Sequence, residues 1–211
     1  MIPGKFIALE GGEGTGKSTQ SLLLADALKR LGLTPETTRE PGGTPGAEAI
    51  RLLLLDPPGE GWGAKAEAML FAAARSDHIE KRIQPALEAG RWVVCDRFVD
   101  SSRAYQGGAG GLGDDFIASL HRIGSGGIRP DMTLIIDVPA RLTRERLSAR
   151  DTAGNDAIGG RADEYHMAVR QHFLKIADDD PASVTVIDGD GSPEDIHSRI
   201  MAALSPLLPV V

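Results

Sequence analysis

The chain has 211 residues, of which 41% are apolar and 25% charged, and it carries a formal net charge of −7. These values are typical of a globular protein with a sizeable core and exclude a disordered or fibrous chain. The acidic balance, with a pI near 5.2, argues against nucleic acid as a partner, because proteins that bind long polyanions usually carry a basic face.

We expect a single domain over residues 1–211, located in the cytoplasm and without membrane contact. No apolar stretch reaches the ~20 residues that a membrane span requires. The N-terminus has no apolar core of signal-peptide length, since Lys5 and Glu10 bracket its first apolar run. The one cysteine, Cys95, lies in an apolar run and is expected to be buried.

Short apolar runs alternate with longer segments of helical periodicity, which predicts an α/β fold with helices on the faces of a parallel sheet. The predicted strands span residues 5–10, 33–40, 91–96, 132–138 and 184–188. The predicted helices span residues 17–31, 44–55, 64–89, 114–123, 141–150, 162–178 and 193–204. Two glycine-rich stretches, 107–113 and 124–127, are predicted loops.

Each predicted strand ends in polar residues. In chain order these are Glu10, Arg39–Glu40, Asp96–Arg97, Asp137 and Asp188. The carboxyl ends of parallel strands share one edge of the sheet, where open α/β sheets bind ligands. The sequence therefore predicts one cleft at that edge.

The first predicted strand runs into a stretch that fits the P-loop pattern G-x-x-x-x-G-K-[ST]. Its glycines allow backbone N–H groups to surround phosphates at a helix N-terminus. Lys17 is expected to reach the β- and γ-phosphates, and the Ser18 hydroxyl to ligate Mg²⁺. The predicted ATP-binding residues here are Gly11, Gly12, Glu13, Gly14, Thr15, Gly16, Lys17, Ser18 and Thr19.

A P-loop occurs in enzymes and in nucleotide-operated switches. A GTPase switch needs Asn-Lys-x-Asp after a strand, and neither Asp137 nor Asp188 is preceded by that pattern. No D-x-x-G with a nearby switch threonine follows a strand either. We therefore favour transfer of a phosphoryl group to an acceptor other than water.

Five further motifs occur in an order that resembles the thymidylate kinase family. They are REPGGT (39–44), LFAAARSDH (70–78), DRF (96–98), SSRAYQGG (101–108) and RPDMTLIIDV (129–138). The resemblance runs from Lys5 to about Phe173. It implies a three-layer P-loop NTPase fold with a five-stranded parallel sheet and a small lid. It also implies Mg²⁺-dependent conversion of dTMP and ATP to dTDP for dTTP biosynthesis, usually in a homodimer.

The resemblance assigns the base and sugar of the acceptor to the middle of the chain. Phe71 and Arg75, four residues apart on a predicted helix, would stack on thymine and donate to its carbonyl. Ser102 and Gln106 match positions near thymine, and Tyr105 matches an aromatic residue that favours deoxyribose. Each has a plainer reading: Phe71 and Tyr105 as core residues, Arg75 as a surface charge, and Ser102 and Gln106 as turn residues.

The resemblance assigns the acceptor phosphate mainly to Arg97, whose planar fork suits bidentate binding. Arg39 and Arg51 are further candidates for the acceptor side. Pro41, also predicted to bind the acceptor, follows Glu40 in a glycine-rich turn. Glu13 is unusual among phosphate-binding amides, and in the family the acid at this place meets the 3′-hydroxyl of the acceptor.

Three aspartates at strand ends compete for the magnesium role. Asp96 is preferred because the adjoining arginine suits an acceptor phosphate, and its alternative reading is an ion-paired strand end. Asp137 is interpreted as mainly structural, and Asp188 opens a loop that resembles the adenine-side loop of the family. The five histidines share no ligand spacing, and no chemistry is predicted for them.

Phosphoryl transfer requires positive charge around the moving phosphoryl group. We expect a lid over about residues 146–163 to supply it. Some family members carry an arginine in the P-loop where this chain has Gly14. We therefore predict that lid arginines supply it: Arg146 on ATP, and Arg150 and Arg161, with Lys17 and Arg97, in catalysis. A solvated helix face is the alternative reading of this cationic run. The alternatives for the whole chain are another nucleoside or nucleoside monophosphate kinase, or a switch protein.

Overall fold

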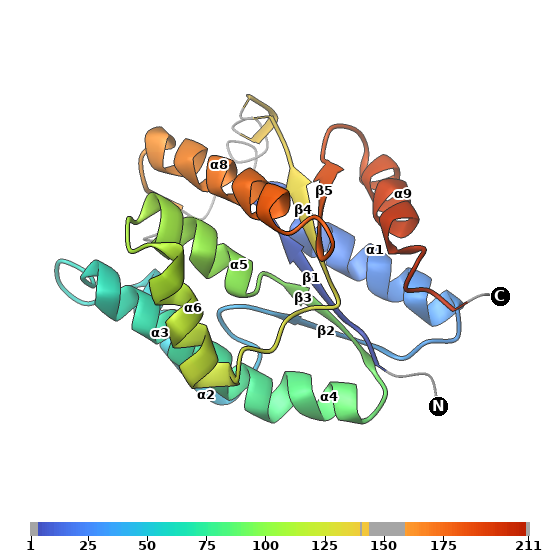
Figure 1. Ribbon diagram of the computed structural model, residues 1–211, viewed down its shortest axis with the longest axis horizontal. Coiled ribbons are helices and arrows are strands. Elements are labelled where there is room, and N and C mark those ends of the chain that lie inside the picture. Colours follow the sequence, from blue (N-terminus) through green and yellow to red (C-terminus); the bar gives the residue numbers. More distant parts are fainter. Residues whose placement is uncertain (1–3, 140, 144–158, 210–211) are drawn as a thin grey trace.

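The computed structural model describes residues 4–139, 141–143 and 159–209. Its strands are β1 (Phe6–Glu10), β2 (Pro35–Arg39), β3 (Trp92–Asp96), β4 (Met132–Asp137) and β5 (Val184–Asp188). They form one parallel sheet in the order β2-β3-β1-β4-β5 (Figure 1). The predicted fold class, a five-stranded parallel sheet flanked by helices, is confirmed.

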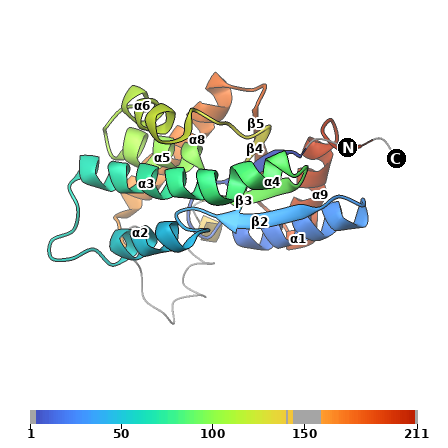
Figure 2. The same ribbon diagram turned by 90° about the horizontal axis from the view of Figure 1, so that it is seen from below.

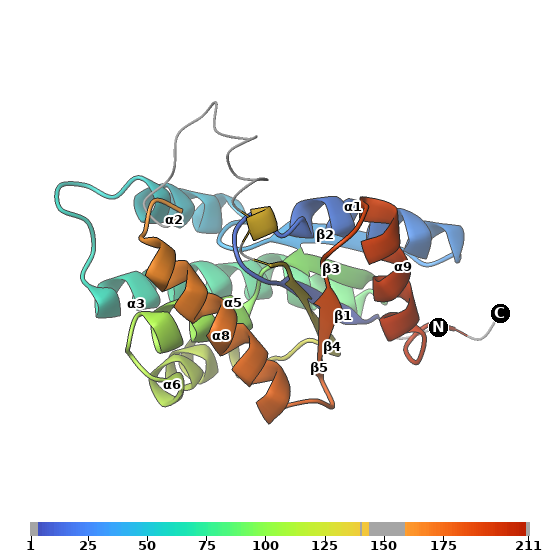
Figure 3. The ribbon, with the colours of Figure 1, turned by 90° about the horizontal axis from the view of Figure 1, so that it is seen from above.

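Helices cover both faces of this sheet. The described helices are α1 (Lys17–Arg30), α2 (Pro45–Leu55), α3 (Ala64–His78), α4 (Gln84–Glu88), α5 (Val99–Ser102), α6 (Asp114–Ser125), α8 (Asp163–Asp179) and α9 (Pro193–Leu204), with π-helical segments η1 (Ile79–Ile83) and η2 (Arg103–Ala109). α1 and α9 lie on one face, and α3, α4, α6 and α8 on the other (Figures 1 and 3). Figure 2 shows the edge strand β2 between α1 and α4.

Side-chain alternation along β1 explains the two cores. Ile7 and Leu9 pack with residues of α1 and α9, whereas Phe6 and Ala8 pack with residues of α3, η1 and α6. All four are buried, as expected for a parallel strand covered on both sides. The polar strand ends therefore gather at one edge between two rigid helical layers.

The predicted helix over 64–89 is interrupted by the π-helical segment η1. Pro85 has no N–H, so it cannot donate to the carbonyl of Lys81 in an α-helical ladder. A local π register before Pro85 accommodates that missing donor. The segment also buries Ile79 and Ile83 in the core beside β3.

The predicted loops at 107–113 and 124–127 are wrong at their first residues. Residues 107–109 belong to η2, and α6 continues to Ser125 before Gly126 adopts a left-handed φ of 64°. A Cβ on Gly108 would lie 2.2 Å from the His172 ring of α8. The glycine therefore serves close helix packing, a purpose that composition alone does not distinguish from a turn.

Most of the predicted lid lies outside the described residues. Of the predicted helix 141–150 the structure describes residues 141–143, which are helical, and of the lid it describes 159–163. Within the described ranges, no helix is long and apolar enough to cross a membrane.

Cys95 lies in the middle of the sheet, on β3. Its side chain is inaccessible to solvent, and its Sγ donates to the carbonyl of Arg97 at 3.0 Å. Burial raises the pKa of this thiol well above its ordinary value. The expectation of a buried cysteine is confirmed.

Candidate active site

The P-loop joins β1 to α1 and curls around its own lysine. Gly11 has a φ of 135°, and a Cβ there would lie 2.6 Å from the carbonyl oxygen of Ile136. Lys17 Nζ donates to the carbonyls of Gly11 (3.2 Å) and Gly12 (2.7 Å). Burial, together with the nearby charge of Arg97, lowers the pKa of Lys17 to about 8. Its ammonium is thus held inside the loop that would receive the phosphates.

Ser18 and Asp96 meet at the carboxyl edge of the sheet. The Ser18 hydroxyl donates to Asp96 Oδ2 at 2.6 Å, in an exposed position. A hydroxyl and a carboxylate are the oxygen ligands that Mg²⁺ accepts while keeping several waters, so the pair fits the predicted magnesium site. Asp137 instead pairs with Arg170 at 2.6 Å, in keeping with its structural interpretation.

Arg97 connects the P-loop to the middle of the chain. It has a φ of 70°, which is uncommon for a residue other than glycine. Its guanidinium donates to Glu13 Oε1 (2.5 Å), to the Gly11 carbonyl (3.0 Å) and to Ser101 Oγ (3.1 Å), and it lies over the Tyr105 ring. The charge of Arg97 lowers the pKa of Glu13 to about 2, so Glu13 is ionised at neutral pH.

Glu10 stabilises the turn that follows Arg97. Its carboxyl accepts hydrogen bonds from the backbone N–H groups of Phe98 (2.7 Å) and Ser101 (3.0 Å) and from Ser101 Oγ (2.5 Å). Burial, reinforced by the charge of Asp100, raises the pKa of Glu10 to about 7. The residue thereby holds the turn that gives Arg97 its direction.

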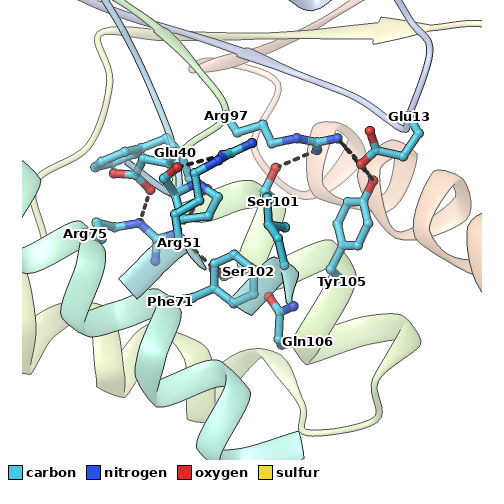
Figure 4. Close-up of a pocket in the computed structure, with 13 residues that line it drawn as sticks. Glu13, Glu40, Arg51, Phe71, Arg75, Arg97, Ser101, Ser102, Tyr105 and Gln106 are labelled. Atoms are coloured by element: carbon cyan, nitrogen blue, oxygen red, sulfur yellow. Dashed lines mark hydrogen bonds and ion pairs between the residues drawn. The ribbon is translucent and has the colours of Figure 1, made fainter. Parts of the chain in front are cut away.

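Next to Arg97 lies a cavity of about 110 Å³, of the same order as the ~150 Å³ cavities that accommodate benzene. We call it the acceptor pocket. It brings together nine of the predicted substrate-binding residues (Figure 4): Glu13, Pro41, Arg51, Phe71, Arg75, Arg97, Ser102, Tyr105 and Gln106. Its size suits one six-membered ring.

Buried ion pairing fixes the side of the acceptor pocket that carries Arg75. Arg75, 3% exposed, donates through Nε to Glu40 Oε2 at 2.7 Å and through Nη2 to Ser102 Oγ at 2.8 Å. The other oxygen of Glu40 lies 3.1 Å from His78 Nδ1, and His78 Nε2 lies 2.6 Å from Thr38 Oγ1. The Arg75 guanidinium is therefore held on several sides.

Arg39 and Arg51, both predicted for the acceptor phosphate, differ in their position relative to this pocket. Arg39 does not line it, and pairs with Glu48 at 3.1 Å on the surface. Arg51 does line it, and donates to the Pro41 carbonyl at 2.7 Å; the Glu40–Pro41 peptide is cis. Thr19 is exposed on the first turn of α1. Arg146 and Arg150 lie outside the described residues.

Arg161 is described, and its hydrogen-bond partners are residues of α3 and α8. It donates to Glu67 Oε2 and to the Tyr165 hydroxyl, both at 2.5 Å, and lies over the Tyr165 ring. These two contacts use two of the five N–H donors of the guanidinium.

Sequence reasoning missed several residues that shape the site: Glu10, Glu40, Glu67, His78 and Ser101. Glu10 and Glu40 were recognised as polar strand ends, and that position could have indicated a role. His78 and Ser101 lie within two of the quoted family motifs, which could have indicated them. Nothing local marks Glu67, because its partners Gln106 and Arg161 are distant in sequence.

The thymidylate kinase family model matches residues 9–200. The chain belongs to the thymidylate kinase family. The thymidylate kinase of Rhizorhabdus wittichii is 53% identical over 208 residues, 99% of this chain and 100% of that protein. The thymidylate kinase of Bradyrhizobium diazoefficiens is 46% identical over 202 residues, 95% of this chain and 89% of that protein.

A solved structure agrees with this assignment. The crystal structure of thymidylate kinase from Ehrlichia chaffeensis superposes with a TM-score of 0.78 at 32% identity, covering 96% of this chain and 100% of that one. The thymidylate kinase match therefore extends over both the P-loop and the acceptor pocket.

Proposed function

We propose that this chain transfers the γ-phosphoryl group of ATP to dTMP and releases dTDP and ADP. The observation that carries the proposal is the Arg97–Glu13 contact, which joins the P-loop to the ring-sized acceptor pocket. Membership of the thymidylate kinase family supports the choice of acceptor. Two nucleotides bound on either side of this contact would meet end to end.

On the acceptor side, we propose that thymine lies on the Phe71 ring with a carbonyl toward Arg75. Glu13 and Tyr105, whose hydroxyl lies 3.2 Å from Glu13 Oε1, would meet the deoxyribose. Arg97 and Arg51 would bind the phosphate, and Arg39 would join them after leaving Glu48. Arg75 in the wall of this pocket is held by Glu40 and Ser102, which favours a fixed orientation of the base.

On the donor side, we propose that the P-loop amides and Lys17 hold the ATP phosphates. Ser18 and Asp96 would hold Mg²⁺, which neutralises charge on the β- and γ-phosphate oxygens when bound. Lys17 would exchange the carbonyls of Gly11 and Gly12 for phosphate oxygens. Arg97 faces the same junction from the acceptor side.

The predicted lid remains part of the proposal, with Arg146 on ATP and Arg150 and Arg161 on the transferring group. Arginines in this role contribute ~10³–10⁵ in other phosphoryl-transfer enzymes. We therefore expect Arg150→Ala to lower kcat by orders of magnitude in a steady-state assay. An unchanged kcat in both Arg150→Ala and Arg161→Ala would exclude a lid mechanism.

Steady-state assay of ADP formation tests the proposed function directly. We expect dTMP to give a higher kcat/KM than dUMP, dCMP or thymidine, because only dTMP offers both the thymine ring and the phosphate. Better turnover of thymidine than of dTMP would indicate a nucleoside kinase. ATP hydrolysis that dTMP does not stimulate would indicate a switch protein.

We also propose a homodimer. α3 packs between α2 and α6, and these helices carry exposed apolar side chains: Leu52, Leu53, Met69 and Ile123. Burying such side chains against a second copy would remove them from water. Sedimentation equilibrium of the protein, with Leu52→Lys as the comparison, measures the association.

A further inference from the structure

Glu67 on α3 contacts two residues from other parts of the chain, one of which lines the acceptor pocket. Its Oε1 accepts from Gln106 Nε2 at 2.9 Å, and its Oε2 accepts from Arg161 Nη2 at 2.5 Å. Gln106 lines the pocket, whereas Glu67 does not. Glu67 therefore acts on the pocket through the amide of Gln106.

This contact determines which end of the Gln106 amide faces a ligand. A carboxylate only accepts hydrogen bonds, so the end of the amide that meets Glu67 must be the NH₂ group. The amide oxygen is then left for the pocket. Figure 4 shows this oxygen on the side of the Phe71 ring and the nitrogen on the opposite side.

We propose that Glu67 is a positioning residue that determines base specificity by fixing the Gln106 amide with its oxygen toward the acceptor. The pocket then selects a pyrimidine whose ring edge presents an N–H donor, as thymine and uracil do at N3. Cytosine presents an unprotonated N3, which would face an oxygen acceptor without a hydrogen bond. This inference rests on the proposed function.

Arg161 supplies the opposite charge that keeps Glu67 in place. The two side chains are 28% and 14% exposed, so the pair is largely shielded from water. Arg161 also donates to the Tyr165 hydroxyl, which in turn donates to the Tyr105 carbonyl at 2.9 Å. Glu67 is therefore tied to η2, the segment that carries Gln106, by two routes.

A simpler role for Glu67 is to clamp α3 to the start of α8. That role predicts an equal loss of activity with every acceptor, since it concerns the shape of the pocket and not the direction of one amide. Base selection and general activity can therefore be separated by comparing acceptors within one variant.

Glu67→Gln is the decisive variant, because a glutamine can meet the Gln106 amide with either end. We expect the ratio of kcat/KM for dTMP over dCMP to fall about tenfold or more, a loss of ~1.4 kcal/mol of discrimination per tenfold. The ratio for dTMP over dUMP should stay unchanged, because both bases carry N3–H. An unchanged dTMP/dCMP ratio, or an equal fall in both ratios, overturns the inference.

A matched control uses the same chemical pair elsewhere. Gln84 Nε2 donates to Glu88 Oε1 at 2.9 Å on the exposed surface of α4, so Glu88→Gln should leave both ratios as in the natural protein. Gln106→Leu keeps the size of the side chain and removes the amide. It should lose the dTMP/dCMP discrimination even if Glu67→Gln does not fold, and retention of that discrimination also overturns the inference.

Failure of the proposed function gives a different result. If the unaltered protein does not phosphorylate dTMP, the proposed function is wrong irrespective of Glu67. If it phosphorylates dTMP and rejects dCMP, but Glu67→Gln and Gln106→Leu reject dCMP equally, only the present inference is wrong.

Discussion

The acceptor pocket and the P-loop differ in how their charged groups are held. In the pocket, Arg75 is fixed by Glu40 and Ser102 in a buried network. In the P-loop, the hydrogen bonds of Lys17 within the described chain go to carbonyls and a hydroxyl of the same loop. Ser18 is exposed. The pocket is thus preorganised, whereas in our proposal the P-loop would exchange internal contacts for phosphate contacts.

Removing the centre of the buried network should have the largest effect. Glu40→Ala leaves the Arg75 guanidinium buried without its carboxylate, and losing one partner of a buried pair costs ~3–5 kcal/mol. We expect that loss in the free energy of unfolding, measured in urea, together with a raised KM for dTMP. Asp179→Asn, which breaks an exposed pair with Lys175, should cost about 1 kcal/mol or less.

Glu40→Gln sharpens this result, since it retains the shape of the side chain and one acceptor oxygen. If Glu40→Ala had the same free energy of unfolding as the natural protein, the interpretation of the pocket as preorganised would be contradicted.

Lys17→Ala tests the donor side of the comparison. A positioned donor to transition-state charge is worth about 10²–10³ in kcat, and we expect a loss of that size in single-turnover experiments. Equilibrium binding of dTMP should change little, because Lys17 contacts the P-loop and not the acceptor pocket. A dTMP affinity that falls as far as kcat would show that the two regions are not independent.

Glu10 lies between the two regions and should give the smallest effect, visible as a pH dependence. Its folded pKa of about 7 exceeds the ordinary glutamate value of 4.5, so proton binding favours the folded state between these values. The resulting stability is fully present below pH 4.5 and is lost as the pH rises through 7. This loss is about 3 kcal/mol, since each pKa unit corresponds to ~1.4 kcal/mol.

Glu10→Gln cannot titrate, so its stability relative to the natural protein should rise by that amount between pH 4.5 and pH 7.5. Urea unfolding at several pH values measures the difference, from which the titration of other groups cancels. A pH-independent difference would show that Glu10 is not protonated in the folded protein near neutrality.

Much of the fold and of the site could be predicted from local pattern. The P-loop spacing placed Lys17 and Ser18 on α1, and polar strand ends placed Asp96 and Arg97 at the ligand edge. Both depend on neighbours within a few residues. The pocket lining followed from the order of family motifs, which placed Phe71 and Arg75 on one helix face.

The remaining contacts depend on the tertiary arrangement. Glu40 and Arg75 are 35 residues apart, and Glu67 and Arg161 are 94 apart, so no periodicity joins them. In the sequence Arg51 was the less distinctive candidate, because an arginine on a helix face is commonplace, yet of Arg39 and Arg51 only Arg51 lines the pocket. The interruption of the helix at η1 could have been inferred from Pro85, whereas the packing of Gly108 against α8 could not.

The buried thiol of Cys95 can report the opening of the sheet, because it is the one cysteine of the sequence. An alkylating reagent reaches this sulfur only when β3 separates from the layers that cover it, so the labelling rate reports that opening rather than surface chemistry. Nucleotides that bind at the carboxyl edge should slow the labelling, and comparing dTMP with ATP would show which of the two protects β3 more.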